Sequence, residues 1–186
     1  MPGLSQHDIK ALQTGAPREL SREVLVSLLG ELKQRLRQPD SKAFEYFEEA
    51  VAVLRAIRSQ DNGDLRIQCL LDACQFFYLF GKVFNAIDPA REAIALARGM
   101  SDQALLRRAL NTLGILYADT GNCSSAIECY AEALELARQL KDADAECVTW
   151  INLGVVLIYL AQYQEALACL ERAVSIAEGN PSLHHL

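Results

Sequence analysis

The chain of 186 residues lacks the segments that would attach it to a membrane or direct it to secretion. It has no run of about eighteen uncharged apolar residues, the length that a membrane-spanning helix requires. Residues 1–10, which include His7 and Asp8, do not have the basic and then apolar composition of a signal peptide. We therefore expect a cytoplasmic protein that does not use the membrane as a partner.

Positive charge is also scarce. The chain has 18 Lys and Arg residues against 24 Asp and Glu residues, a formal net charge of −6. A surface that binds nucleic-acid phosphates requires Lys and Arg clustered on one face. The charge balance therefore argues against nucleic acid as a partner.

Side chains that carry catalysis or bind metals do not occur in usable arrangements. The three histidines, His7, His184 and His185, lie at the chain ends, and no Gly-rich phosphate loop is present. The six cysteines contain no Cys-x-x-Cys pair, so we interpret them as packing residues, with Cys123 in a predicted turn as the candidate reactive thiol. We expect no enzyme activity, no metal and no cofactor.

The strongest positive feature is a repeat with an interval of 40 residues in the second half of the chain. Leu113-Gly114 recurs as Leu153-Gly154. Small residues recur in the same phase, and one interval earlier as well: Ala86, Ala126 and Ala166, then Ala93, Ala133 and Ala173. A fixed interval of this length is typical of stacked repeat architectures.

Apolar residues recur at helical spacing along most of the chain, and no segment alternates for long enough to predict a strand. The sequence therefore predicts an all-α fold. Turn signals at Gly, Pro, Asn and Asp separate the expected helices. These helices are 18–37, 41–59, 64–80, 84–98, 102–119, 124–140, 143–160 and 164–178.

Small and large residues alternate on one face of the second helix of each pair. Ala126 and Ala133 flank Tyr130 at separations of four and three, which places all three on one side of a helix. In the first helix, Gly114 costs about 1 kcal/mol relative to Ala, so a close helix contact must compensate. We expect Tyr117 and Trp150 to pack around these mid-helix glycines.

These residues resemble those of the tetratricopeptide repeat family, in a long form of 40 residues where the typical repeat has 34. The resemblance is carried by Trp150, Leu153-Gly154, Ala166 and Ala173, and by their counterparts in the preceding repeat. It implies a right-handed α-solenoid of about four antiparallel helix hairpins. The implied division is 1–17 as an N-terminal extension or short helix, 18–62 as a degenerate first hairpin, 63–102, 103–142 and 143–180 as repeats, and 181–186 as a tail or the start of a further helix.

The second repeat departs from this pattern. Ala90 replaces the large central residue, and Pro89 stands where the other repeats have cysteine. Asp88-Pro89 is typical of a helix start. We therefore expect an irregular segment from Lys82 to Ile87, and an array that bends or gapes at this point.

In this family the first helix of each pair lines a concave groove that binds peptides or partner helices, so the resemblance implies a partner-binding face. By the phase of the repeats it carries Gln68, Asp72, Gln75, Tyr78, Arg108, Asn111, Thr112, Ile115, Ile151, Asn152, Val155 and Tyr159. Asn111 and Asn152 are the sharpest candidates, because an amide both donates and accepts. The alternative is that these amides form hydrogen bonds between neighbouring repeats.

The predicted function is protein association through this groove, as the N-terminal sensory or partner-binding part of a larger cytosolic regulatory protein. A stand-alone adaptor, a homodimeric scaffold and a structural spacer are the alternatives. Residues 182–186 are similar to the start of another first helix, and a terminal hairpin without a polar cap leaves apolar surface open. We therefore expect either a longer protein or a homodimer through the C-terminal hairpin.

Overall fold

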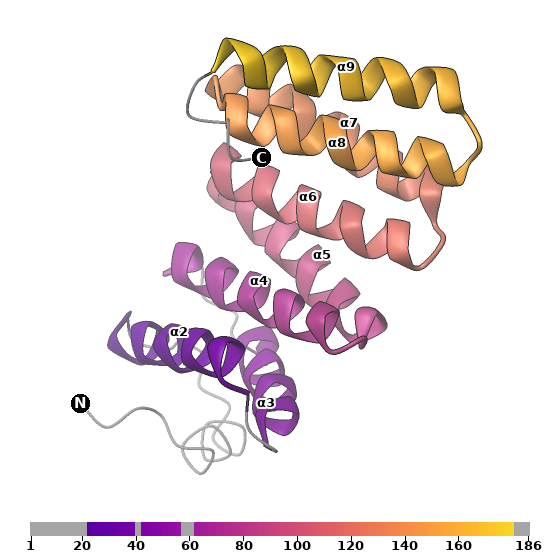
Figure 1. The fold of residues 1–186 in the computed structure, drawn as a ribbon. Helices are drawn as coiled ribbons and strands as arrows, with labels where there is room; N and C mark the ends of the chain where they lie inside the picture. Colours follow the sequence, from indigo (N-terminus) through magenta and orange to yellow (C-terminus); the bar gives the residue numbers. More distant parts are fainter. Residues whose placement is uncertain (1–21, 40–41, 57–61, 181–186) are drawn as a thin grey trace. The chain divides into compact units, whose positions relative to one another are not determined.

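The computed structural model describes residues 22–39, 42–56 and 62–180, and the regular elements in these ranges are all α-helices (Figure 1). They are α2 (Arg22–Arg37), α3 (Ala43–Ala56), α4 (Gly63–Leu79), α5 (Val83–Met100), α6 (Gln103–Asp119), α7 (Cys123–Leu140), α8 (Ala143–Tyr159) and α9 (Tyr163–Gly179). The chain divides into two compact units, Met1–Asp102 and Gln103–Leu186, which we name the N-terminal unit and the C-terminal unit. The predictions for residues 1–17 and 181–186 lie outside the described ranges.

The predicted all-α hairpin fold is confirmed. From Gly63 onward, each helix begins and ends within two residues of its predicted range, and the largest difference is at 84–98, observed as Val83–Met100. None of the helices in the described ranges is long and apolar enough to cross a bilayer.

The expected irregular segment from Lys82 to Ile87 is wrong, because α5 begins at Val83 and continues through Pro89. A proline at this depth removes one backbone hydrogen bond and disfavours the preceding turn. In α5, however, Pro89 belongs to a buried face with Ala86, Ala90 and Ala93. Packing of this face outweighs the local preference of Asp88-Pro89 for a helix start.

The N-terminal unit is built around α4, which contacts α2, α3 and α5. Phe47 of α3 stacks on Phe76 of α4 with ring centroids 3.8 Å apart, and Phe80 stacks on Phe76 at 4.4 Å. Arg66 of α4 is buried and pairs with Glu92 of α5. A buried guanidinium is stable only when it is paired, so this ion pair ties the α4–α5 hairpin together.

The C-terminal unit consists of the hairpins α6–α7 and α8–α9, and α8 packs on α7. Its central cluster contains Ala126 and Tyr130 of α7 and Val156 of α8, all buried. Because small and large residues interlock at this point, the second hairpin is held against the first by side-chain packing.

Large side chains from the partner helix cover the mid-helix glycines. A Cβ atom added at Gly114 would lie 2.5 Å from Cε1 of Tyr130, and one added at Gly154 would lie 3.1 Å from Leu170. Tyr130 and Leu170 occupy the space next to the glycines, and the expected Tyr117 and Trp150 pack against the neighbouring clusters. The open side of each glycine faces the second helix of its own hairpin, and the close contact inferred from the cost of glycine is made there.

The turns inside the hairpins require left-handed backbone. Gly81 and Gly121 have φ values of +69° and +78°, which glycine adopts at no steric cost. The α8–α9 hairpin has Ala161 at φ +57° in the same place. A residue with a Cβ atom is strained there by roughly 1–2 kcal/mol, so the turn conformation follows from helix packing as well as from the turn residue.

Asp142 joins two helices of the C-terminal unit. Its Oδ1 accepts a hydrogen bond from the Ala145 backbone N–H at 3.0 Å, which caps α8. Its Oδ2 lies 3.0 Å from a guanidinium nitrogen of Arg107 on α6. The predicted helix start at Asp142 is therefore also a link between α6 and α8.

We expect Gly114→Ala to lower the melting temperature and Gly154→Ala to leave it equal or higher. Tyr130 is fully buried and cannot withdraw, so overpacking should cost about 1–3 kcal/mol against a helix-propensity gain of about 1 kcal/mol. Leu170 is only half-buried and its contact is looser. Thermal unfolding followed by circular dichroism compares the two variants, and equal losses would contradict this packing argument.

The cysteines differ in accessibility, which predicts an order of modification. Burial raises the pKa of Cys69 and of Cys74 to about 12, and both thiols are directed at backbone carbonyl oxygens. Cys123, the first residue of α7, is half-exposed. A thiol reagent at mildly alkaline pH should modify Cys123 in the folded protein and the two buried thiols only after unfolding, as read by peptide mass spectrometry.

The same pKa shifts predict how stability depends on pH. Cys69 and Cys74 stay protonated in the folded protein while unfolded thiols ionise near pH 9, so the free energy of unfolding should fall as pH rises above about 9. Rapid modification of either buried thiol under native conditions would contradict both expectations.

Candidate partner-binding face

The predicted groove residues of the C-terminal unit begin on α6. Arg108, Asn111, Thr112 and Ile115 follow one another at spacings of three, one and three residues, so they share one side of the helix. Arg108 is exposed, and it forms no ion pair with a carboxylate in the described ranges. The Thr112 hydroxyl donates to the Arg108 carbonyl at 3.0 Å, so its proton is used within α6. The guanidinium is therefore the group of α6 best placed to meet an external carboxylate.

The predicted groove residues on α8 are Ile151, Asn152, Val155 and Tyr159, and their spacing likewise places them on one side of the helix. Val155 is 38% exposed and Tyr159 65%, and the neighbouring Ile158 is 44% exposed. These are large apolar side chains on an otherwise well-packed helix. The end of α8 thus presents an exposed apolar surface.

Asn111 and Asn152 connect the two helices. The Asn152 amide nitrogen donates to Oδ1 of Asn111 at 3.1 Å, with both side chains half-buried. The inter-repeat hydrogen bond foreseen by the alternative interpretation is present. Each amide has two donors and an acceptor of its own, so the pair retains the Asn111 amide donors and the Asn152 carbonyl oxygen for another group.

The remaining predicted groove residues lie on α4 of the N-terminal unit. Gln68 and Asp72 are half-buried, whereas Gln75 and Tyr78 are exposed. The structure thus brings the residues of α6 and α8 together in one unit and places those of α4 in the other.

The sequence analysis expected open apolar surface on the terminal hairpin but did not name its residues on α9. Leu167 is 53% exposed and Val174 56%, whereas Leu134, the counterpart of Val174 in α7, is 5% exposed. In the preceding repeat, α8 packs on the α7 face that corresponds to this face of α9. A residue-by-residue comparison of successive repeats would have identified Leu167 and Val174 as apolar residues on the outer face of α9.

Metal ligands do not converge in the part of the chain that the structure describes. No group of three or more His, Cys, Asp or Glu side chains in residues 22–39, 42–56 and 62–180 is arranged to hold a metal ion. The chemistry of the candidate face is therefore that of apolar contact, amide hydrogen bonds and one exposed guanidinium.

Comparison with known proteins supports the repeat assignment. The family model described as tetratricopeptide repeat matches residues 105–179. A model of anaphase-promoting complex subunit 5 matches residues 55–113. Tonsoku-like protein of Danio rerio is 28% identical over 95 residues, which cover 51% of this chain. The chain spans 7% of the length of that relative.

Two solved structures share the fold. The crystal structure of MamA has a TM-score of 0.59 at 16% identity and aligns with 93% of this chain and 86% of its own. BtubC from P. vanneervenii has a TM-score of 0.52 at 18% identity, covering 93% of this chain and 88% of its own. The matched model, the 40-residue interval and the helix hairpins identify residues 105–179 as tetratricopeptide repeats, which supports a protein-interaction repeat module.

Proposed function

We propose that the face formed by α6 and α8 binds an extended peptide or a helix of a partner protein. The observation that carries this proposal is the exposed apolar row Val155, Ile158 and Tyr159 beside the Asn111–Asn152 pair. Exposed apolar surface bordered by polar groups is typical of protein-binding sites. The amide pair supplies one donor side and one acceptor side, which suits the backbone of a peptide.

The partner's chemistry follows from the order of groups along this face. Apolar side chains of the ligand would cover Val155 and Tyr159, and its backbone would meet the two amides. A carboxylate of the ligand would reach Arg108, since a guanidinium binds a carboxylate with two parallel hydrogen bonds. On α4, the exposed Gln75 and Tyr78, with Gln68 and Asp72, form a second proposed contact surface in the N-terminal unit.

The wider role that we propose is the sensory or partner-binding part of a larger cytosolic regulatory protein, in which an occupied groove alters an attached output domain. The relative of much greater length supports this context. A stand-alone adaptor would use the same face. A structural spacer would not, so changes to the groove separate the spacer from the other two roles.

A second proposed association is self-pairing through the α8–α9 end. Leu167 and Val174 occupy positions that another helix covers in the preceding repeat, and here they are more than half exposed. A second copy of the chain could bury this apolar surface in a two-fold symmetric contact.

The groove proposal predicts loss of a partner on substitution. We expect Arg108→Ala, Asn111→Ala and Asn152→Ala together, or Val155→Asp alone, to reduce partner recovery about tenfold or more. Removing both amides leaves no half-buried group without its partner, so folding should be retained. The measurement is affinity capture from a lysate of the source organism, quantified by mass spectrometry, with circular dichroism as the folding check.

Ala131→Asp is the matched control, because Ala131 is exposed on α7 and lies outside the groove. Partners captured equally by the wild type, the control and both groove variants would contradict the proposal and favour a spacer role.

The self-pairing proposal predicts a dimer that dissociates when charge is placed on α9. We expect Leu167→Glu with Val174→Glu to give a monomer in sedimentation velocity, because paired copies would bury these carboxylates without partners. Ser175→Glu, an exposed change on the same helix, should leave the dimer intact. A monomeric wild type at high protein concentration would rule this association out.

A further inference from the structure

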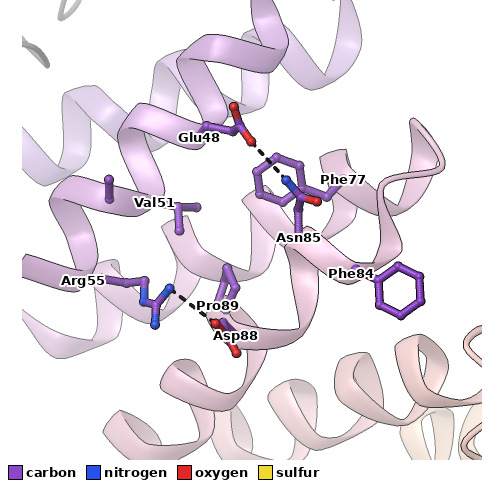
Figure 2. A pocket seen from close by; sticks show the side chains of 9 residues that line it. Glu48, Val51, Arg55, Phe77, Phe84, Asn85, Asp88 and Pro89 are labelled. Carbon is purple, nitrogen blue, oxygen red and sulfur yellow. Dashed lines mark hydrogen bonds and ion pairs between the residues drawn. The ribbon is translucent and has the colours of Figure 1, made fainter.

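A pocket opens in the N-terminal unit between α3 and α5 (Figure 2). Glu48, Val51 and Arg55 of α3 form one wall, and Asn85, Asp88 and Pro89 of α5 form the other. Its volume is about 280 Å³. Sites for drug-sized ligands enclose about 300–1,000 Å³, so this pocket suits one or two side chains better than a cofactor.

The inner surface of the pocket is apolar. Val51 and Phe77 are 8% and 1% exposed, and Pro89 is buried. Pro89 replaces the cysteine that the later repeats carry at the matching position, Cys129 and Cys169. Pro89 therefore lines the wall that α5 contributes to the pocket.

Phe84 stands at the edge of this pocket and is 77% exposed, the highest value among the exposed large apolar side chains of the described residues. The matching positions in the two later repeats are Ser124 and Gln164. The first turn of the helix accepts a polar residue at this place, so packing within the hairpin does not require phenylalanine. An aromatic side chain that the fold does not need, beside an apolar pocket, indicates an external partner.

The rim determines the charge that the partner must carry. Arg55 lies 3.6 Å from Asp88 and 3.3 Å from Glu92, so its positive charge is already compensated. At the other end of the pocket, the Asn85 amide donates to Oε1 of Glu48 at 3.0 Å, as Figure 2 shows. Asn85 is neutral, and Glu48 forms no ion pair among the described residues, so its charge is the one left uncompensated at the rim.

We propose that this pocket is a second protein-binding site, which accepts a leucine or aromatic side chain of a partner segment with a Lys or Arg close by. The apolar side chain enters between Val51 and Pro89 and covers Phe84. The cation pairs with Glu48, and the net charge of −6 favours its approach at long range. A partner with an acidic segment is disfavoured, because the guanidinium at the rim is occupied.

The experiment uses the full chain and a phage-displayed library of random linear peptides as the probe. Selection against the wild type should enrich peptides that combine an aromatic residue or leucine with a nearby Lys or Arg. Synthetic copies of the enriched peptides are then measured by fluorescence anisotropy. We expect about a tenfold or greater loss of affinity for Phe84→Ser and for Glu48→Lys, the loss that follows removal of an interface anchor.

Two control variants separate this site from general surface adhesion. Leu79, the last residue of α4, is exposed and apolar but does not line the pocket. Leu79→Asp introduces the residue type that the next repeat has at the matching position, Asp119. Glu128→Lys makes the same charge reversal as Glu48→Lys, on an exposed position of α7. Both controls should bind the peptides as the wild type does.

Enrichment of acidic peptides, absence of enrichment, or equal binding by Phe84→Ser and the wild type would each overturn the proposal. Peptides that lose binding only in the Asn111 and Asn152 variants would also overturn it, because they would belong to the α6–α8 face. Phe84→Ser introduces a residue that the next repeat carries at this place, and circular dichroism confirms that the variant folds.

Discussion

The fit of one large side chain into the space left by a glycine is the contact on which the C-terminal unit depends. The Tyr130 ring lies 2.5 Å from the place of a Cβ atom at Gly114, and Ala126 lets α7 approach closely enough for this contact to form. Val156 then packs on the same cluster and brings α8 with it. Because α6 and α8 are both positioned by this cluster, Asn111 and Asn152 come within hydrogen-bond distance.

This packing divides the repeat into positions that are constrained and positions that are free to differ. Matching positions of successive repeats carry alanine at Ala126 and Ala166, and both side chains are buried. A larger side chain there would separate the helices. Other matching positions of successive repeats carry side chains of different chemistry. Examples are Asn111 and Ile151, and Phe84 and Ser124. Specificity in a repeat array resides in such positions, because changing them does not alter the stacking.

The apolar surfaces that we connect with binding lie where repeat packing is incomplete. On α9, Val174 is exposed because no helix in the described ranges covers it as α8 covers the α7 face. Between α3 and α5, the opening is lined by Pro89, and the degenerate first hairpin provides the opposite wall. On α9, a surface that is buried in the preceding repeat is thus exposed, and between α3 and α5 an apolar pocket is open to another molecule.

The sequence by itself determined the helices and their phase, because the 40-residue interval, the turn glycines and the small residues are local signals with one physical interpretation. It also indicated that Gly114 and Gly154 have close neighbours. Only the tertiary structure decided which neighbours these are, since the side chain that meets the Cβ position depends on how the partner helix packs. In the same way, burial of Pro89 within α5 overrode a local helix-start signal, and the pairing of two asparagines from successive repeats required both helices in place. The pocket beside Phe84 depends on the separation of α3 and α5, which is set by packing across many residues and leaves no local pattern in the chain.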